Sequence, residues 1–473
     1  MPKKSSKSLD ETVSNDTELA KLYQKKSHYD HIIDRPDTYI GSLDKIPLKY
    51  WINDKSSNEI DELIDGEVSN KFVNKEITVI PALLNIIEEI LVNAYDNSNR
   101  IKQNIIKTKK RLKKMTYIKI VVENDTISIE NDGEGIDIAK HPEEQIYIPQ
   151  MIFGNLLTSA NYDDNEERTT GGRNGYGAKL TNIFSSFFKV ETSDRPRKLS
   201  YIQEFKNNML EISEPQITKM KGTPFTRITF KPDYTKFNID GLTDDIISYI
   251  EKRAYDMIAC SNGELSVYFN NKKLEIKDFN SYISLYIGNN TSRVELKTER
   301  WNVGAGLSPE FSFNQISFVN GINTRTGGKH VDYITSQITK GLAQYIKKKH
   351  KISVREQTIK ENLIVFVNST IVNPSFDTQT KAKLTTVIKS FGSECKITDK
   401  FIEKLATTTD IVKRAMALND FKGQQLLTKS DGKKIKKLYD IEKLEDAKKA
   451  GTKESSKCTL ILTEGLSAMS MAV

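Results

Sequence analysis

Apolar residues recur at helical spacing between Pro81 and Arg100, and this stretch gives the strongest helix pattern in the sequence. The pattern predicts one long amphipathic helix with an apolar face turned to the core. The apolar positions are Leu83, Leu84, Ile86, Ile87, Ile90, Leu91 and Ala94.

The same helix carries a polar stripe. Glu89, Asn93 and either Asp96 or Asn97 are three or four residues apart, so their side chains fall on one side of the helix. Such a stripe is commonly just the solvated face of an amphipathic helix. A carboxylate and an amide one turn apart can also hold a water molecule and a Mg²⁺ ion, which prefers oxygen ligands. The helix alone leaves both interpretations open.

Two short segments after this helix alternate apolar and polar residues, as paired strands do. They are Ile118–Val122 and Thr126–Ile129, and they lead into the sequence N-D-G-E-G-I at 131–136. A carboxamide followed by two glycines can present an acceptor to the amino group of a base and leave space for its ring. An isolated D-G-x-G is also a common hairpin turn.

Glycines alternate with polar residues in T-T-G-G-R-N-G-Y-G-A-K-L-T-N-I-F-S-S-F at 169–187, and an apolar run follows. The pattern predicts a loop that feeds a helix. Glycines let the backbone approach a ligand, and the first N–H groups of a helix are free to bind an anion. Lys179 would add positive charge. A flexible turn before a core helix is the alternative.

Composition shifts divide the rest of the chain. Residues 1 to about 20 are polar and predict a disordered tail, and 154–164 has the polar composition of a lid over a site. A strand is expected at 225–230 and a helix at 244–259, and a second domain is expected from about residue 263.

The second domain shows a strand, helix, strand order, with apolar runs at 316–319 and 363–367 around a helix that ends near Lys349. This order predicts a crossover unit. The loop at 373–381 follows the second strand, so Gln379 and Lys381 either reach the ligand of the neighbouring domain or form a surface turn. Residues 397–446 predict basic helices, and 458–465 predict a strand whose own sheet would belong to a further domain.

Charge and cysteine usage narrow the setting. The 473 residues include 71 Lys and Arg against 63 Asp and Glu, a net charge of +8 that permits a polyanionic partner. The basic run at 107–114 either contacts phosphate or is solvated. Three widely separated cysteines predict free thiols in a reducing compartment. No apolar stretch approaches the length of a membrane span, so we expect a protein of the nucleus or cytosol.

Three motifs together resemble the signature boxes of the GHKL ATPases. They are E-I-L-V-N-A-Y-D-N at 89–97, N-D-G-E-G-I at 131–136 and G-R-N-G-Y-G-A-K-L at 172–180. More narrowly, the chain resembles the ATPase region of eukaryotic-type DNA topoisomerase II over about residues 20 to 473. Further matches in order are R-P-D-T-Y-I-G-S at 35–42, L-T-S-A-N-Y-D-D at 157–164, G-G-K-H-V-D-Y-I at 327–334, N-P-S-F-D-T-Q-T-K at 373–381 and C-T-L-I-L-T-E-G at 458–465.

The resemblance implies an α/β (α+β) fold: a GHKL (Bergerat) sandwich of a mixed sheet with helices on one face, then a ribosomal-protein-S5-like transducer domain with a βαβ crossover. The expected divisions are a disordered tail (1–20), an N-terminal arm (21–40), the GHKL domain (41–262), the transducer (263–405), a basic helical linker (406–456) and the first strand of a truncated toprim domain (457–473).

The resemblance also implies roles for single residues with ATP and Mg²⁺ as cofactors. Glu89 would be the general base, Asn93 the Mg²⁺ ligand, and Gln379 and Lys381 the pair that senses the γ-phosphate. Tyr23 would reach the nucleotide of a partner protomer, and Glu464 matches the metal-binding acid of the cleavage domain. The remaining ATP-binding residues would be Asp96, Asn97, Asn131, Gly133, Gly135, Ser159, Asn161, Thr226, Gly172, Arg173, Asn174, Gly175, Tyr176, Gly177, Ala178 and Lys179.

The sequence departs from the family pattern in two places. Ala160 stands where many relatives have a second serine, and Leu466 and Met469 replace an aspartate and a lysine of the E-G-D-S-A-K motif. No DNA-cleaving tyrosine can be assigned. We therefore expect a chain that hydrolyses ATP without cutting DNA.

The family implies a homodimer that forms on ATP binding and traps double-stranded DNA, in the nucleus, or in the cytoplasm if the protein came from a virus that replicates there. Two alternatives remain: another GHKL ATPase, of the chaperone or histidine-kinase type, and a module that binds ATP without hydrolysing it. The presence of Glu89 argues against the second.

Overall fold

The computed structural model describes residues 22–23, 25–53, 71–109, 112–156, 158, 167–172, 175–310, 312–419, 447 and 449–462. Several predicted features lie outside these residues. They are the tail at 1–20, most of the segment predicted as a lid, Leu466 and Met469, and the candidate site residues Ser159, Asn161, Arg173, Asn174 and Glu464.

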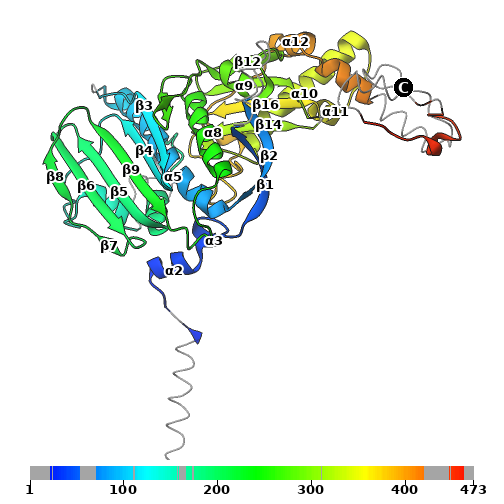
Figure 1. Cartoon of the computed structure of the whole chain (residues 1–473). Helices are drawn as coiled ribbons and strands as arrows, with labels where there is room; N and C mark the ends of the chain where they lie inside the picture. The colour runs from blue at the N-terminus through cyan, green and yellow to red at the C-terminus, as the bar shows by residue number, and fades with distance from the viewer. Residues whose placement is uncertain are drawn as a thin grey trace, which may run out of the picture.

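A large mixed sheet forms the left half of the molecule in Figure 1. Its strand order is β11-β10-β3-β4-β9-β5-β6-β7, and β8 pairs with β6 beside this path. All pairs are antiparallel except that of β10 with β3. The strands are β3 (Tyr117–Glu123), β4 (Thr126–Asp132), β5 (Ser185–Asp194), β6 (Leu199–Lys206), β7 (Glu211–Ile212), β8 (Gln216–Lys219), β9 (Phe225–Pro232), β10 (Ser266–Phe269) and β11 (Lys272–Lys273).

Helices cover one face of this sheet, as predicted. The longest, α5 (Pro81–Thr108), begins with a proline in its first turn. It is followed by the C-cap residue Lys109, which has the left-handed conformation common at helix ends. Its apolar stripe is buried against the sheet. The other helices of this layer are α6 (Ile148–Gly154), α7 (Gly177–Ile183) and α8 (Asp244–Cys260).

The first sheet continues past the predicted domain boundary at residue 263. Strand β10 pairs in parallel with β3, with Ser266 opposite Tyr117, and β11 pairs with β10. The strand set that starts near Gly263 therefore joins the first sheet and not the second. The crossover helix α8 packs beside β10, and this connection returns the chain to the edge of the sheet.

The second domain is built on a five-stranded sheet of order β12-β13-β16-β14-β15. Strands β14 and β16 are parallel, and α10 and α11 connect them, so the predicted crossover is present. Helices α10 and α12 pack on this sheet. The elements are α9 (Phe279–Ile287), β12 (Arg293–Lys297), β13 (Trp301–Leu307), β14 (Asn314–Val319), β15 (Ile322–Asn323), α10 (Lys329–His350), α11 (Glu356–Lys360), β16 (Leu363–Ser369), η1 (Ile388–Ser390), α12 (Asp399–Thr408) and η2 (Ser455–Lys457).

The two domains share one apolar core. On β14 and β16, Ile316, Phe318, Ile364 and Phe366 belong to the same cluster as the apolar face of α5. The residues between them along β16, such as Val365, face the separate cluster beneath α10. Because side chains alternate along a strand, the second sheet is covered on both faces, and one face is covered by the first domain.

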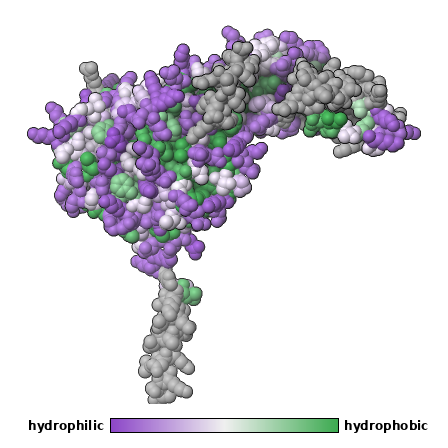
Figure 2. Space-filling model, in the orientation of Figure 1, coloured by the Kyte–Doolittle hydropathy of each residue, from purple (hydrophilic) through white to green (hydrophobic). Residues whose placement is uncertain are grey.

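The N-terminal part of the described chain wraps the first domain. Helices α2 (His28–Asp34) and α3 (Pro36–Tyr39) lead to the hairpin of β1 (Ile46–Asn53) and β2 (Phe72–Val79), which packs on α8. Figure 2 shows mostly hydrophilic side chains on this face, with hydrophobic ones gathered between the large sheet and the second domain. In the described part of the chain, no helix has both the length and the apolar character needed to cross a bilayer.

The strand predicted at 458–465 does not form in its described part. Residues 458–462 have no strand hydrogen bonds, and Leu460, Ile461 and Leu462 are exposed. An apolar run forms a strand only beside a partner strand, and this segment has none among the described residues. Upstream, α12 and the helical residues 411–419 agree with the predicted helical character, while 420–446 lie outside the described range.

Candidate active site

The polar stripe of α5 meets a loop of the second domain at the centre of the candidate site. Nζ of Lys381 lies 2.7 Å from Oε1 of Glu89, although the two residues are 292 positions apart. Both side chains are largely buried, with 14% and 7% of their surface exposed. Lys381 has a positive φ of 56°, an unusual conformation for a residue with a side chain. The loop therefore holds its ammonium group against Glu89, and Gln379 lies half-buried in the same loop.

The glycine loop approaches α5 from the other side. A Cβ atom at Gly177 would lie 2.0 Å from Oε2 of Glu89, so only glycine leaves room for the carboxylate at this position. Gly177 begins α7, and the hydroxyl of Thr181 one turn later donates to the carbonyl of Ile86 on α5 at 2.9 Å. These contacts fix the start of α7 beside Glu89.

Asp96 holds the upstream half of the glycine loop. Its two carboxylate oxygens accept hydrogen bonds from the backbone N–H groups of Gly171 and Gly172 at 2.8 and 2.9 Å. Burial raises the pKa of Asp96 from 3.8 to about 6, although the two N–H groups act in the opposite direction. Asp96 was expected to bind ATP, and in this structure both oxygens are used by the loop backbone.

Lys179 is buried and its ammonium group donates to two backbone carbonyls, of Thr158 at 2.8 Å and Gly175 at 2.7 Å. Burial lowers its pKa to about 8. The side chain thus ties the two ends of the 158–175 segment together. Within the described part of the chain it donates to these two carbonyls, and an ammonium group has a third N–H donor for a further acceptor.

The strands provide a second group of polar side chains. Asn131 near the end of β4 lies opposite Thr226 on β9, and the hydroxyl of Thr226 is 2.8 Å from that of Thr192 on β5. Asn131 is buried, and Gly133 and Gly135 follow with φ values of 130° and 79°. Three adjacent strands thus place an amide and two hydroxyl groups together. Asn97 of α5 borders the same turn, because its Nδ2 would lie 3.6 Å from a Cβ at Gly133.

The second domain also anchors the segment before the glycine loop. The backbone N–H of Asn373 donates to the carbonyl of Arg168 at 2.8 Å, and the side-chain oxygen of Asn373 accepts from the N–H of Arg168. Nδ2 of Asn320 lies 3.4 Å from the carbonyl of Thr170. The loop is therefore held by both domains.

Asn93 lies beside Asp96 where α5 faces the glycine loop. A Cβ at Gly172 would lie 3.9 Å from Oδ1 of Asn93 and 3.6 Å from Oδ2 of Asp96, so two oxygen atoms face the loop backbone there. Within the described ranges, no group of three His, Cys, Asp or Glu side chains surrounds a metal position. Mg²⁺ bound through one side-chain oxygen, water and substrate phosphate fits such a donor set.

The arm contacts the loop through aromatic rings. The ring of Tyr176 packs edge-on against His28 of α2 at 5.6 Å and near Tyr39 of α3 at 6.4 Å. Tyr23 is 76% exposed, so its ring is accessible from outside. Ala178 is buried beneath the loop and contributes packing.

Sequence reasoning missed two features of the site. Thr192 was not singled out, because a threonine within an alternating strand carries no signal of its own. The ion pair between Glu88 of α5 and Arg253 of α8 was also missed. The available signal was the run of charged residues at 252, 253 and 256 on the buried side of a helix, where charges are rare unless they are paired.

Comparison with known proteins places this arrangement in a family. Residues 267–433 match the DNA gyrase B family model. The DNA topoisomerase 2 proteins of Drosophila melanogaster and Saccharomyces cerevisiae are 44% and 43% identical to the chain over 96% and 95% of its length. The chain spans only about 30% of the length of these relatives.

A solved structure decides the family. The ATPase region of Saccharomyces cerevisiae topoisomerase II matches with 41% identity and a TM-score of 0.75, over 85% of this chain and 100% of that one. The chain belongs to the DNA topoisomerase II family. Within the topoisomerase II family, the ATPase and transducer domains from Balamuthia mandrillaris match with 40% identity and a TM-score of 0.75, over 85% of this chain and 98% of that one. The predicted GHKL fold followed by a transducer is thus confirmed, and a chaperone or histidine kinase is not favoured.

Proposed function

We propose that this chain binds ATP between α5, the glycine loop and the ends of β4 and β9, and hydrolyses it. The observation that carries the proposal is the buried contact between Glu89 and Lys381, which joins a carboxylate of the first domain to a cation of the second. A buried carboxylate beside a phosphate-binding loop suits a general base, and a cation from the second domain suits a sensor of the γ-phosphate.

Each group has a distinct task in this reaction. Glu89 accepts a proton from the attacking water, and Asn131 with Thr226 binds the adenine edge. The N–H groups of the loop 172–179 and the third donor of Lys179 face the phosphates. Lys381 leaves Glu89 for the γ-phosphate, with Gln379 beside it, and this frees the carboxylate to act as a base.

Mg²⁺, held by Asn93 and the phosphates, would supply charge neutralisation on the β- and γ-phosphate oxygens. Asp96, which is expected to bind the nucleotide, also holds the loop backbone at Gly171 and Gly172, since a carboxylate has about four acceptor sites. Asn97, Gly133 and Gly135 shape the wall near the adenine. Ser159, Asn161, Arg173 and Asn174 complete the phosphate and ribose contacts.

In the complete protein, we infer that this region is the ATP-operated gate of a type II DNA topoisomerase. ATP binding brings two copies together, Tyr23 reaches the partner's nucleotide, and a DNA duplex is trapped between the copies. DNA cleavage would belong to the part of the relatives' length that this chain does not span, and Glu464 would supply a metal-binding acid to that cleavage domain. The expected setting is the nucleus, because the relatives are DNA topoisomerases of eukaryotes.

The experiment is a measurement of ATPase rate against protein concentration, with and without duplex DNA. Because the proposed site works in a dimer, the rate per chain should rise with concentration, level off and be stimulated by DNA. A rate per chain that is constant across the dimerisation range contradicts the gate. A chain that does not hydrolyse ATP at any concentration contradicts the enzymatic function itself.

A further inference from the structure

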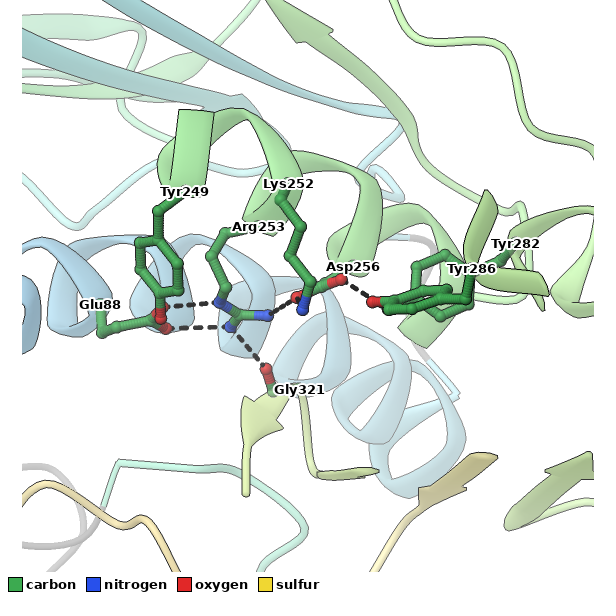
Figure 3. Close-up of polar contacts among 8 residues, drawn as sticks. All are labelled: Glu88, Tyr249, Lys252, Arg253, Asp256, Tyr282, Tyr286 and Gly321. Carbon is green, nitrogen blue, oxygen red and sulfur yellow. Dashed lines mark hydrogen bonds and ion pairs between the residues drawn. The ribbon is translucent and has the colours of Figure 1, made fainter. Parts of the chain in front are cut away.

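A buried network of charged and phenolic side chains joins α5, α8 and α9 (Figure 3). At its centre is Arg253 of α8, which has no exposed surface. Its Nε and Nη2 atoms donate to the two oxygens of Glu88 at 2.6 and 2.9 Å, and its Nη1 atom donates to Asp256 at 2.7 Å. One planar guanidinium thus binds a carboxylate on each side.

The network is balanced in charge and well supplied with donors. Lys252 donates to Oδ2 of Asp256 at 2.9 Å, and the hydroxyl of Tyr282 on α9 donates to Oδ1 at 2.6 Å. The hydroxyl of Tyr249 donates to Glu88 at 2.7 Å. Two acids face two bases in a buried setting, where removing one partner leaves the other charge uncompensated. Loss of any one member is therefore costly.

Arg253 also reaches the second domain. Its Nη2 atom donates to the carbonyl of Gly321 at 3.2 Å, in the turn between β14 and β15. Gly321 has a φ of 81°, and a Cβ there would lie 2.3 Å from the ring of Tyr95 on α5. The turn therefore sits directly on α5, and Arg253 fastens it there.

The neighbouring residues Glu88 and Glu89 consequently join α5 to the second domain at two places. Glu89 is joined through Lys381, and Glu88 through Arg253 and Gly321. Successive residues of a helix point about 100° apart, so a helix whose Glu88 is clamped on both oxygens has little freedom to turn. The direction of Glu89 follows from that of Glu88.

We propose that Arg253 is a positioning residue for ATP hydrolysis: it fixes the rotation of α5 that aims Glu89, and it keeps this rotation in register with the turn at Gly321 of the second domain. The inference rests on the proposed function. When Lys381 leaves Glu89, the contact through Arg253 remains, so the second domain can move at one attachment while the base stays aligned by the other.

The test compares R253K with the wild type in ATP turnover and in binding of a non-hydrolysable ATP analogue. Lysine keeps the charge but cannot bind Glu88, Asp256 and Gly321 together. We expect kcat to fall by about tenfold or more, since small misplacements of a catalytic group are costly. The dissociation constant of the analogue should change by less than about threefold, because the nucleotide contacts are intact.

R293K is the matched control. Arg293 also holds several partners, including Asn280 and the carbonyl of Gly288, and among the described residues none of its hydrogen-bond partners belongs to α5 or α8. Its kcat should equal that of the wild type. E88Q is the second variant, which keeps the shape of the side chain and removes only its charge. It should lower kcat in the same way, even if R253K does not fold.

A double variant separates positioning from general support. If Arg253 acts by aligning Glu89, R253K should add little to the loss already caused by E89Q, which removes the base that is aligned. Additive losses, or an analogue affinity that falls in parallel with kcat for both R253K and E88Q, overturn the inference. A wild-type chain without ATPase activity would instead overturn the proposed function, and an active wild type with unchanged R253K and E88Q would overturn the inference alone.

Discussion

The ammonium group of Lys381, in the second domain, donates to the carboxylate of Glu89, in the first, with 2.7 Å between Nζ and Oε1. In the function proposed above, the γ-phosphate of ATP is the anion that draws Lys381 away from Glu89, at the moment when the carboxylate is needed as a base.

Replacing Glu89 with glutamine should leave nucleotide binding and ATP-dependent dimerisation intact and stop phosphate release. Glutamine keeps the shape of the side chain but cannot accept the proton, so we expect a loss of roughly 10² to 10⁴ in turnover. Phosphate release and sedimentation with a non-hydrolysable analogue measure the two properties. Undiminished turnover would remove Glu89 from the mechanism.

Replacing Lys381 with alanine should slow turnover and spare the affinity for ADP, which has no γ-phosphate. K383A is the control, because Lys383 is an exposed lysine of the same loop. Calorimetric titration with ADP and a steady-state ATPase assay check both statements. A large loss of ADP binding in K381A would show that Lys381 contacts another part of the nucleotide.

The stability of the nucleotide-free chain should depend on the same pair. Removing one partner of a buried ion pair typically costs about 3–5 kcal/mol, because the remaining charge is uncompensated. We therefore expect K381A to lower the free energy of unfolding. The double variant E89Q/K381A should recover part of the lost stability, because it leaves no uncompensated charge. Denaturant unfolding of the four proteins gives the coupling energy, and a coupling near zero would mean that the contact is not formed in solution.

Gly177 offers a test in which the fold is kept and the base is moved. In G177A the new methyl group would overlap Oε2 of Glu89, the flexible end of a side chain, so Glu89 must turn away. We expect normal thermal stability and a kcat lowered by about 10², the scale of a misplaced catalytic group. G306A is the control, since a Cβ there has its nearest neighbour at 3.4 Å. Equal kcat values for the two variants would contradict the close approach.

Asp96 should give a pH dependence of stability. Its pKa is raised by burial from 3.8 to about 6, so the folded chain holds this proton more tightly than the unfolded chain. The stability that it contributes is complete below pH 3.8 and is lost as the pH rises through about 6, by at most about 3 kcal/mol. D96N cannot titrate. The free energy of unfolding of the wild type minus that of D96N should therefore fall between pH 4 and 7, and a constant or rising difference would contradict the raised pKa.

The helices and the local motifs were predictable because their signals are local. The spacing of apolar residues predicted α5, and the alternation at 118–129 predicted the β3–β4 pair. In the second domain, two apolar runs with a helical pattern between them predicted the crossover of β14, α10 and β16. The side-chain tasks within the site were less predictable: Lys179 and Asp96 bind backbone groups, and a residue's type does not say whether a ligand or a loop will use its charge.

Contacts between distant segments were beyond the sequence pattern. Nothing near Arg253 indicates that its partners are Glu88 and the carbonyl of Gly321, because burial arises only when α5, α8 and the second sheet pack together. The place of β10 was missed for the same reason. A short apolar run after a helix suggests the first strand of another domain. Pairing with the free edge of β3 is what places this run in the first sheet.

The return of β10 to β3 also affects how the chain can be made. The first sheet cannot be completed until residues 266–273 are available. The last candidate site residue on this sheet, Thr226 on β9, comes much earlier in the chain. A nascent chain that has reached residue 262 would leave the backbone of β3 unpaired along one edge, and such edges recruit strands from other chains. Co-translational folding of the first domain should therefore wait for β10, and this interval is the time when the growing polypeptide is most in need of a chaperone.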